Sequence, residues 1–341
     1  MAAEAKKEIE SAVIKPSCLP WYRPFLQQIT ELHQQQRLPH AILMSLPGEA
    51  DELEFIWHLS MVLLCQNTQT ERPCGECSSC HLMLSNTYPD FKLVGLEHDE
   101  KTKKLNKNIK IEQIREVIHE VYLTRSYDNL KIIAIYPADK MSHAGANSLL
   151  KTLEEPAANV FIVLATHNPG KIPVTLRSRC QHWNPALPNP DESLNWLQSQ
   201  GMADELARQH LELANNDPIL AFKLNSIGYL EIVADFKQQF SRYLKNQIDV
   251  TQLTQKLTTY ELAIVRRLIS MVIKAYCYQY SGFQGQQATP GTTNKAAAQA
   301  MIALLAETER QLMTEENNLD IKLQLEDVLI SVKQIITRSH H

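Results

Sequence analysis

Four of the seven cysteines in this 341-residue chain are spaced as C-x8-C-x2-C-x2-C. Thiolates at such short spacings are typical ligands of Zn²⁺, which binds four of them in a closed tetrahedron without an open position for a substrate. In a reducing compartment, cysteines crowded in this way point to a metal rather than to disulfides. We therefore predict a structural zinc module over residues 65–80, whose ligands are Cys65, Cys74, Cys77 and Cys80. His81, next to the last cysteine, is interpreted as an exposed helix residue, with a role as a competing ligand as the alternative.

The other candidate residues follow a predicted parallel β-α-β unit. Ile132–Ile135 and Val160–Leu164 are apolar runs of the kind that strands buried on both faces require. Between them, Ala146–Glu155 has leucines at helical spacing, and Pro156 ends the helix. Ligands of such sheets bind beyond the carboxyl ends of the strands, which directs attention to His167–Cys180.

These residues also carry a resemblance to a known family. The run NSLLKTLEEP (147–156), followed by Leu164-Ala165-Thr166 and by Ser178-Arg179-Cys180, resembles the signature of AAA+ clamp-loader subunits. The resemblance implies an α/β fold with a P-loop-type parallel sheet covered by helices on both faces, a small helical lid and an all-α collar domain. It also implies a role in loading the ring-shaped sliding clamp onto primed DNA, as part of the DNA polymerase III holoenzyme.

The loop after the first predicted strand, Ala41–Met44, is where an active member of this family binds phosphate. In a working G-x-x-x-x-G-K-[ST] loop, backbone amides and the lysine cradle the phosphates, and the hydroxyl holds Mg²⁺. The four defining positions fall here on Ser45, Ala50, Asp51 and Glu52. Both glycines, the lysine and the hydroxyl are missing, and the acidic side chains would repel a triphosphate.

The acidic pair that would hold Mg²⁺ is also missing from the sequence. It should close the strand Ile132–Ile135, but the candidate positions are Tyr136-Pro137 or Pro137-Ala138. Asp139 lies nearby without an acidic neighbour. Because phosphoryl transfer depends on these groups, we predict that the chain neither binds ATP productively nor hydrolyses it.

Arg179 is the residue to which the resemblance assigns chemistry. In AAA+ rings, an arginine at this motif reaches into the nucleotide site of the next subunit, where its planar cation stabilises charge on the γ-phosphate. Ser178 and Cys180 are expected to position its loop. A surface arginine in a salt bridge is the alternative. Thr166 occupies the family's first nucleotide-sensing position and is expected to be structural here.

The resemblance divides the chain into three domains. Residues 1–184 form the base with the zinc module, residues 185–228 the lid, and residues 229–337 the helical collar through which subunits form their ring. The implied partners are the gamma or tau motor subunits and a delta subunit in a hetero-pentamer, with the sliding clamp and primed DNA contacted through the complex.

Composition narrows the remaining possibilities. The net charge of −4 argues against binding nucleic acid by bulk charge. The chain has no run of about 18 apolar residues and no apolar core near its start, so we expect no membrane span, no signal peptide and a cytoplasmic location. The basic run Lys101–Lys110 is interpreted as a solvated loop, with a DNA contact as the alternative.

Two other functions remain open at this point. An active AAA+ motor subunit is opposed by Asp51, Glu52 and the missing Mg²⁺ ligands, and ATPase activity of the purified chain would favour it. A zinc-containing DNA-binding protein is opposed by the net negative charge, and tight, salt-sensitive DNA binding would favour it.

Overall fold

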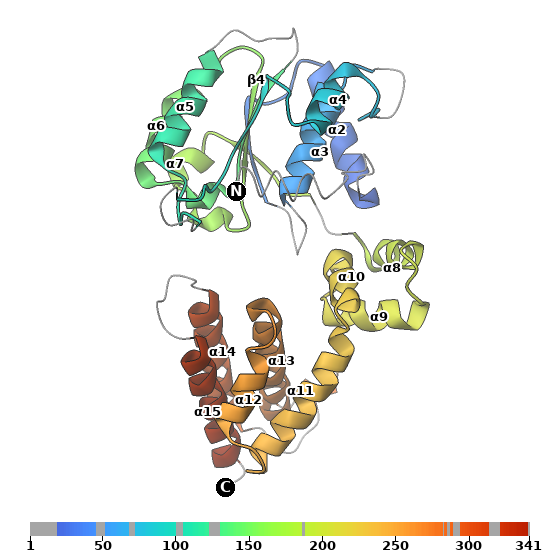
Figure 1. The fold of residues 1–341 in the computed structure, drawn as a ribbon, viewed down its shortest axis with the longest axis vertical. Helices are drawn as coiled ribbons and strands as arrows, with labels where there is room; N and C mark the ends of the chain where they lie inside the picture. Colours follow the sequence, from blue (N-terminus) through green and yellow to red (C-terminus); the bar gives the residue numbers. More distant parts are fainter. Residues whose placement is uncertain are drawn as a thin grey trace. The chain divides into compact units, whose positions relative to one another are not determined.

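The computed structural model divides the chain into two compact units, residues 1–224 and 225–341, which are described separately (Figure 1). The structure describes residues 19–45, 52–67, 72–99, 105–122, 130–185, 188–281, 283–284, 287–288, 294–313 and 321–339. Of the predicted phosphate-loop positions, Ala50 and Asp51 lie outside these ranges, as does the first part of the basic run, Lys101–Lys104.

The first unit is built on a five-stranded parallel sheet in the order β2-β3-β4-β1-β5. The strands are β1 (Ala41–Met44), β2 (Phe91–Val94), β3 (Lys131–Ile135), β4 (Val160–Ala165) and β5 (Gln181–Trp183). All residues of the three inner strands, β1, β3 and β4, are buried. This arrangement confirms the predicted parallel sheet, and the carboxyl ends of all five strands meet at one edge.

Helices cover both faces of this sheet, as predicted (Figure 1). One apolar core joins one face of the sheet to the helices α2 (Arg23–Gln34), α3 (Glu52–Leu64) and α4 (Ser78–Leu84). The other joins the opposite face to α5 (Ile111–Tyr122), α6 (His143–Glu154) and α7 (Val174–Arg177). Successive residues of β4 alternate between the two cores, because side chains alternate across a strand.

The loops that follow β3 and β4 contain the candidate residues Thr166 and Arg179. A short 3₁₀ turn, η2 (Ala138–Lys140), follows β3, and Ser142 then caps α6 by accepting a hydrogen bond from the Gly145 amide at 3.1 Å. A second turn, η3 (Pro169–Lys171), and the four residues of α7 connect β4 to β5. Leu176 of α7 is fully buried, which anchors this short helix to the core. Arg179 follows directly after Ser178, the C-cap of α7.

Three short helices complete the first unit. They are α8 (Pro190–Ser199), α9 (Asp204–Leu213) and α10 (Pro218–Ser226), the last of which crosses the boundary between the units. Trp196 of α8 lies edge-on to Trp21 of the 3₁₀ turn η1 (Pro20–Tyr22), with ring centroids 5.5 Å apart. Trp196 also lies edge-on to Phe222 of α10, at 5.8 Å. Aromatic rings therefore join the predicted lid to the start of the sheet domain.

The second unit is helical. Its helices are α11 (Tyr229–Leu244), α12 (Val250–Leu257), α13 (Leu262–Ser281), α14 (Lys295–Met313) and α15 (Ile321–Ser339), with a two-stranded hairpin of β6 (Phe283–Gln284) and β7 (Gln287–Ala288) after α13. Lys333 of α15 fixes the end of α11, because its Nζ donates to the Tyr243 carbonyl oxygen at 2.8 Å and to Asn246 Oδ1 at 2.7 Å.

The predicted helical C-terminal region is thus present. The boundary predicted between base and lid lies inside the first unit, so the division into three domains stays a prediction. Among the described helices, none has the length and apolar character needed to cross a bilayer.

Candidate functional site

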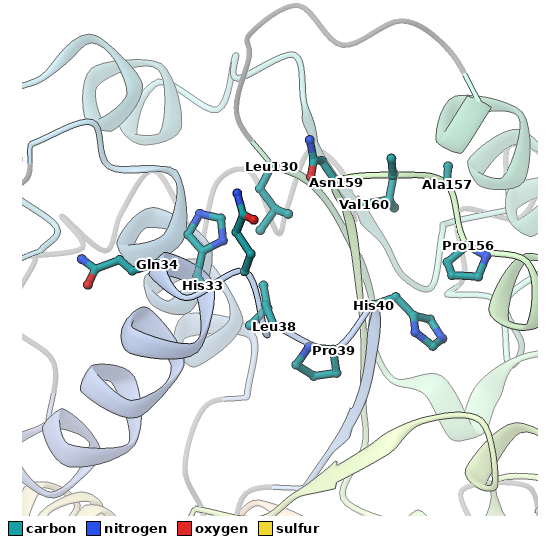
Figure 2. Close-up of a pocket in the computed structure, with 12 residues that line it drawn as sticks. His33, Gln34, Leu38, Pro39, His40, Leu130, Pro156, Ala157, Asn159 and Val160 are labelled. Atoms are coloured by element: carbon teal, nitrogen blue, oxygen red, sulfur yellow. The ribbon is translucent and has the colours of Figure 1, made fainter.

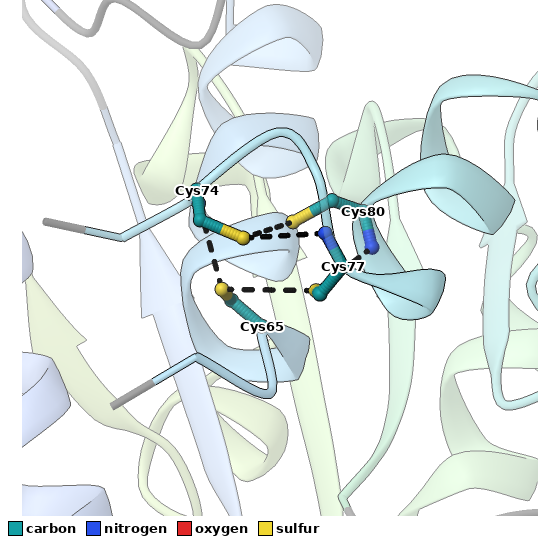
Figure 3. Close-up of side chains that lie close together, drawn as sticks. All are labelled: Cys65, Cys74, Cys77 and Cys80. Atoms are coloured by element: carbon teal, nitrogen blue, oxygen red, sulfur yellow. Dashed lines mark hydrogen bonds between the residues drawn. The ribbon is translucent and has the colours of Figure 1, made fainter. Parts of the chain in front are cut away.

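The four predicted metal ligands come together in the structure (Figure 3). All four cysteine sulfurs lie within 4.8 Å of one another. The Sγ atoms of Cys65 and Cys77 are 4.0 Å apart, as are those of Cys74 and Cys80. A tetrahedral zinc with Zn–S bonds of about 2.3 Å separates its sulfurs by about 3.8 Å. The spacing of these sulfurs therefore fits a single zinc ion.

Local backbone geometry explains how the cysteines reach this arrangement. Cys65 follows the last turn of α3, and Cys77 caps the start of α4, which carries Cys80. The amides of Cys77 and Cys80 each donate to the sulfur of the preceding ligand, Cys74 and Cys77 respectively, at 3.4 Å. Such bonds favour thiolate over thiol, as metal binding requires.

The four thiols differ in acidity. Burial disfavours the Cys77 thiolate, but backbone hydrogen bonds from Cys80 and Gln66 outweigh it and lower the pKa of Cys77 to about 6. A hydrogen bond from the Glu76 backbone lowers the pKa of Cys74. Burial raises the pKa of Cys65 and of Cys80. Two ligands thus ionise readily, and the two buried ones need the metal to displace their protons.

Arg179 lies where the sequence predicts an exposed arginine, just beyond α7. Its Nε donates to Glu154 Oε1 at 2.8 Å, its Nη2 donates to the same oxygen, and its Nη1 donates to the Thr175 carbonyl oxygen at 2.8 Å. The arginine side chain is 34% exposed and that of Glu154 50% exposed. A salt bridge was the alternative predicted for this arginine, but its partner was not predicted, since Arg179 and Glu154 are 25 positions apart and no local pattern links them.

The neighbours of Arg179 hold its loop. Ser178 is the C-cap of α7, and its Oγ donates to the Thr175 carbonyl oxygen at 3.1 Å. Cys180 is buried in the core beneath α6, and this burial raises its pKa to about 11, so it is a packing thiol rather than a nucleophile. These contacts agree with the supporting roles predicted for both residues, which stay predictions.

At the edge of the sheet where a nucleotide would bind, polar side chains from the loops after β3 and β4 form hydrogen bonds with one another. Thr166 donates its hydroxyl proton to Asp139 Oδ1 at 2.5 Å and accepts from the Asn168 amide at 2.9 Å. Beside them, Tyr136 Oη lies 3.3 Å from His167 Nε2. Asp139 and Thr166 are therefore engaged with each other, in keeping with the structural role predicted for Thr166. Ser45 directly follows β1 at this edge and Glu52 begins α3, while residues 46–51 are outside the described residues.

A cavity of about 650 Å³ lies at the opposite edge of the sheet (Figure 2). It is bounded by His40 before β1, Leu130 before β3 and Val160 at the start of β4. His33 and Gln34 from the end of α2 close one side. Because ligands of parallel sheets bind at the carboxyl ends of the strands, this cavity is not the predicted nucleotide site.

Comparison with known proteins relates the chain to subunits of DNA polymerase III. A family model described as "DNA polymerase III, delta subunit" matches residues 22–186. A Yersinia pestis protein named DNA polymerase III subunit delta′ is 37% identical over 182 residues, 53% of this chain and 52% of the relative. A Pseudomonas aeruginosa protein of the same name is 29% identical over 249 residues, 72% of this chain and 73% of the relative.

The chain is similar to delta′ subunits of DNA polymerase III. Its match spans about half the length of the Yersinia delta′ relative. Among solved structures, a gamma-subunit-related protein of DNA polymerase III from Thermotoga maritima aligns with 91% of this chain and 99% of its own, at 16% identity and a TM-score of 0.45. The similarity to delta′ subunits agrees with the signature residues in α6, β4 and the Arg179 loop, and the fold is an α/β fold on a parallel sheet with a helical C-terminal region.

Proposed function

We propose that this chain is a clamp-loader subunit that does not hydrolyse ATP and that supplies Arg179 to the nucleotide site of a neighbouring motor subunit. Similarity to delta′ subunits of DNA polymerase III is the observation that best supports the proposal. The complex would contain gamma or tau motor subunits and a delta subunit, and would load the sliding clamp onto primed DNA. Coupling of ATP binding to clamp opening would then pass through the interface that contains Arg179.

The residue types at the phosphate-loop positions support the proposal that this chain does not hydrolyse ATP. Ser45, Ala50, Asp51 and Glu52 replace the groups that bind phosphate and Mg²⁺, and the carboxylate of Asp139 accepts a hydrogen bond from Thr166. Arg179, in contrast, keeps a planar, permanently charged donor group on an anchored and partly exposed loop. Its role is therefore to stabilise charge on a nucleotide held by another chain, where such arginines contribute roughly 10³–10⁵ in rate at one site.

The zinc module has a structural role in this proposal. Cys65, Cys74, Cys77 and Cys80 would hold one Zn²⁺ through four thiolates, and a closed tetrahedral site without a water ligand stabilises folding rather than catalysing a reaction. The metal would join the end of α3 to the start of α4.

The test is the ATPase rate of a reconstituted clamp loader that contains this chain, together with ATP binding by the chain alone. We expect no ATP binding by the chain. Arg179→Ala should remove the share of the rate contributed by the neighbouring site, and Arg179→Lys should not restore it, because an ammonium lacks the fork geometry.

Arg208→Ala is the matched control, because Arg208 forms a similar exposed ion pair with Asp204, at 2.9 Å, on the lid helix α9. Equal rates for Arg179→Ala and Arg208→Ala would contradict the arginine role. ATP binding by the isolated chain would instead favour the active motor subunit, and tight DNA binding that weakens with salt would favour the zinc-containing DNA-binding protein.

A further inference from the structure

The guanidinium of Arg179 is bound to its own chain. Of its five N–H donors, one on Nε and one on Nη2 point to Glu154 Oε1, and one on Nη1 points to the Thr175 carbonyl oxygen. The second donor on Nη1 is directed to Ser178 Oγ at a longer distance of 3.5 Å, which leaves one donor on Nη2. A γ-phosphate, which is best held by two parallel N–H donors, would therefore meet a guanidinium whose Nε/Nη2 edge is already occupied by a carboxylate.

The position of Glu154 strengthens this hold. Glu154 is the last residue of the twelve-residue helix α6, so its carboxylate adds to the partial negative charge that a helix carries at its C-terminal end. Arg179 is the cation that pairs with Glu154 at this helix end, which gives the arginine an electrostatic reason to lie back on its own chain.

We propose that Glu154 is a positioning residue that holds Arg179 in a retracted arrangement, and that Arg179 engages a neighbour's nucleoside triphosphate only by exchanging this carboxylate for phosphate. The inference rests on the proposed function of Arg179. The retracted pair is an ion pair exposed to water, so its competition with a multiply charged triphosphate is weak enough to be overcome. The chain would thus contribute its arginine only when the neighbouring site is filled.

A different role for Glu154 predicts the opposite effect of mutation. If Glu154 oriented Arg179 toward the triphosphate, removal of its charge would lower the rate of the complex. If Glu154 holds the arginine back, removal of its charge makes the arginine available at lower ATP concentrations. The direction of the change in apparent KM therefore distinguishes the two roles.

The experiment measures ATP hydrolysis by the reconstituted complex across ATP concentrations with Glu154→Gln, which keeps the shape of the side chain and removes its charge. We expect the apparent KM to fall about two- to fivefold, the range for release of an exposed ion pair, with the rate at saturating ATP unchanged. Glu155→Gln is the matched control, since it removes the adjacent exposed charge, and we expect it to leave KM unchanged. In an Arg179→Ala background, Glu154→Gln should have no effect.

Three results would overturn the inference: an unchanged KM, a lower rate at saturating ATP, or the same response to Glu154→Gln with and without Arg179. If Arg179→Ala alone leaves the rate unchanged, the proposed function fails first, and this inference with it. A second measurement needs no partner: in the isolated chain, Glu154→Gln should speed solvent exchange of the Arg179 Nε–H proton followed by ¹⁵N NMR, and unchanged exchange would contradict the retracted pair.

Discussion

At the scale of single residues, the structure contains a buried charged pair that contributes to stability. Lys131 and Asp90 are both buried, with Lys131 Nζ 3.9 Å from Asp90 Oδ1 and 3.0 Å from the Glu120 carbonyl oxygen. Lys131 opens the inner strand β3, and Asp90 directly precedes the edge strand β2, so the pair lies where these neighbouring strands begin. Removal of the lysine would take a positive charge away from the buried carboxylate of Asp90.

We predict that Lys131→Met lowers the free energy of unfolding by about 3 kcal/mol, because Asp90 then loses its buried counter-charge. The measurement is chemical denaturation followed by circular dichroism. Lys92→Met is the control, since Lys92 forms an exposed pair with Glu116, and its loss should cost below about 1 kcal/mol. Equal losses in the two variants would show that the buried pair has no special weight.

The cysteine cluster gives a second prediction at this scale. At pH 7.5 the thiol of Cys77, with its pKa near 6, is ionised, whereas burial keeps Cys65 and Cys80 protonated. Because zinc binds thiolates, adding it to the metal-free chain should release the protons that Cys65 and Cys80 carry, and affinity should rise with pH as protons compete less. Calorimetry in buffers of different ionisation enthalpy counts these protons.

The same experiment on Cys74→Ser tests the ligand set. We expect this variant to bind zinc more weakly and to unfold more readily, with the Arg179 loop unaffected. One zinc per chain retained at wild-type affinity in Cys74→Ser would contradict the four-cysteine site, as would zinc binding to the wild-type chain without proton release.

At the scale of elements, the apolar inner strands were predictable and the edge strands were not. The predicted strands at 41–44, 132–135 and 160–164 correspond to β1, β3 and β4 within one residue at either end. Phe91–Val94 and Gln181–Trp183 escaped prediction, because the edge strands β2 and β5 are only partly buried and lack a continuous apolar run. A strand that is buried on both faces has a continuous apolar run that can be recognised in the sequence. An edge strand, which pairs with a neighbour on one side only, lacks this run.

The start of helix α6 was also not predicted correctly from the sequence. Its apolar stripe predicted a start at Ala146, but the helix begins at His143, because the Ser142 side chain caps it. Proximity of the four cysteines followed from their spacing along the chain. The contact between Arg179 and Glu154 did not, since it depends on how α6 and α7 pack together in three dimensions.

The short helices α8, α9 and α10 lead to a testable prediction about stability. Trp196→Ala removes the ring that contacts both Trp21 and Phe222, and we expect it to cost about 2 kcal/mol and to speed amide exchange in α8. Trp196→Phe, the control, keeps an aromatic ring and should retain most of the protection. Hydrogen–deuterium exchange read by mass spectrometry measures both variants, and equal protection in Trp196→Ala and the unaltered chain would mean that the aromatic contact does not stabilise α8.

At the scale of the whole molecule, the chain consists of two units with different kinds of core. The first buries its apolar side chains against the two faces of a sheet. The second buries them between helices, among them Val265, Leu268, Leu329 and Val332. The sequence predicted both kinds of core, but the collar function of the second unit comes from family resemblance, because an apolar helical stripe predicts packing and not the identity of a partner.

The division into two units has a spectroscopic consequence. All four tryptophans of the chain, Trp21, Trp57, Trp183 and Trp196, belong to the first unit. Indole emission therefore reports on the sheet-containing unit alone, whereas far-ultraviolet ellipticity reports on the helices of both. A melting curve recorded by tryptophan emission would not report unfolding of the C-terminal helices. The difference between the emission and ellipticity curves would therefore measure the unfolding of these helices without any label.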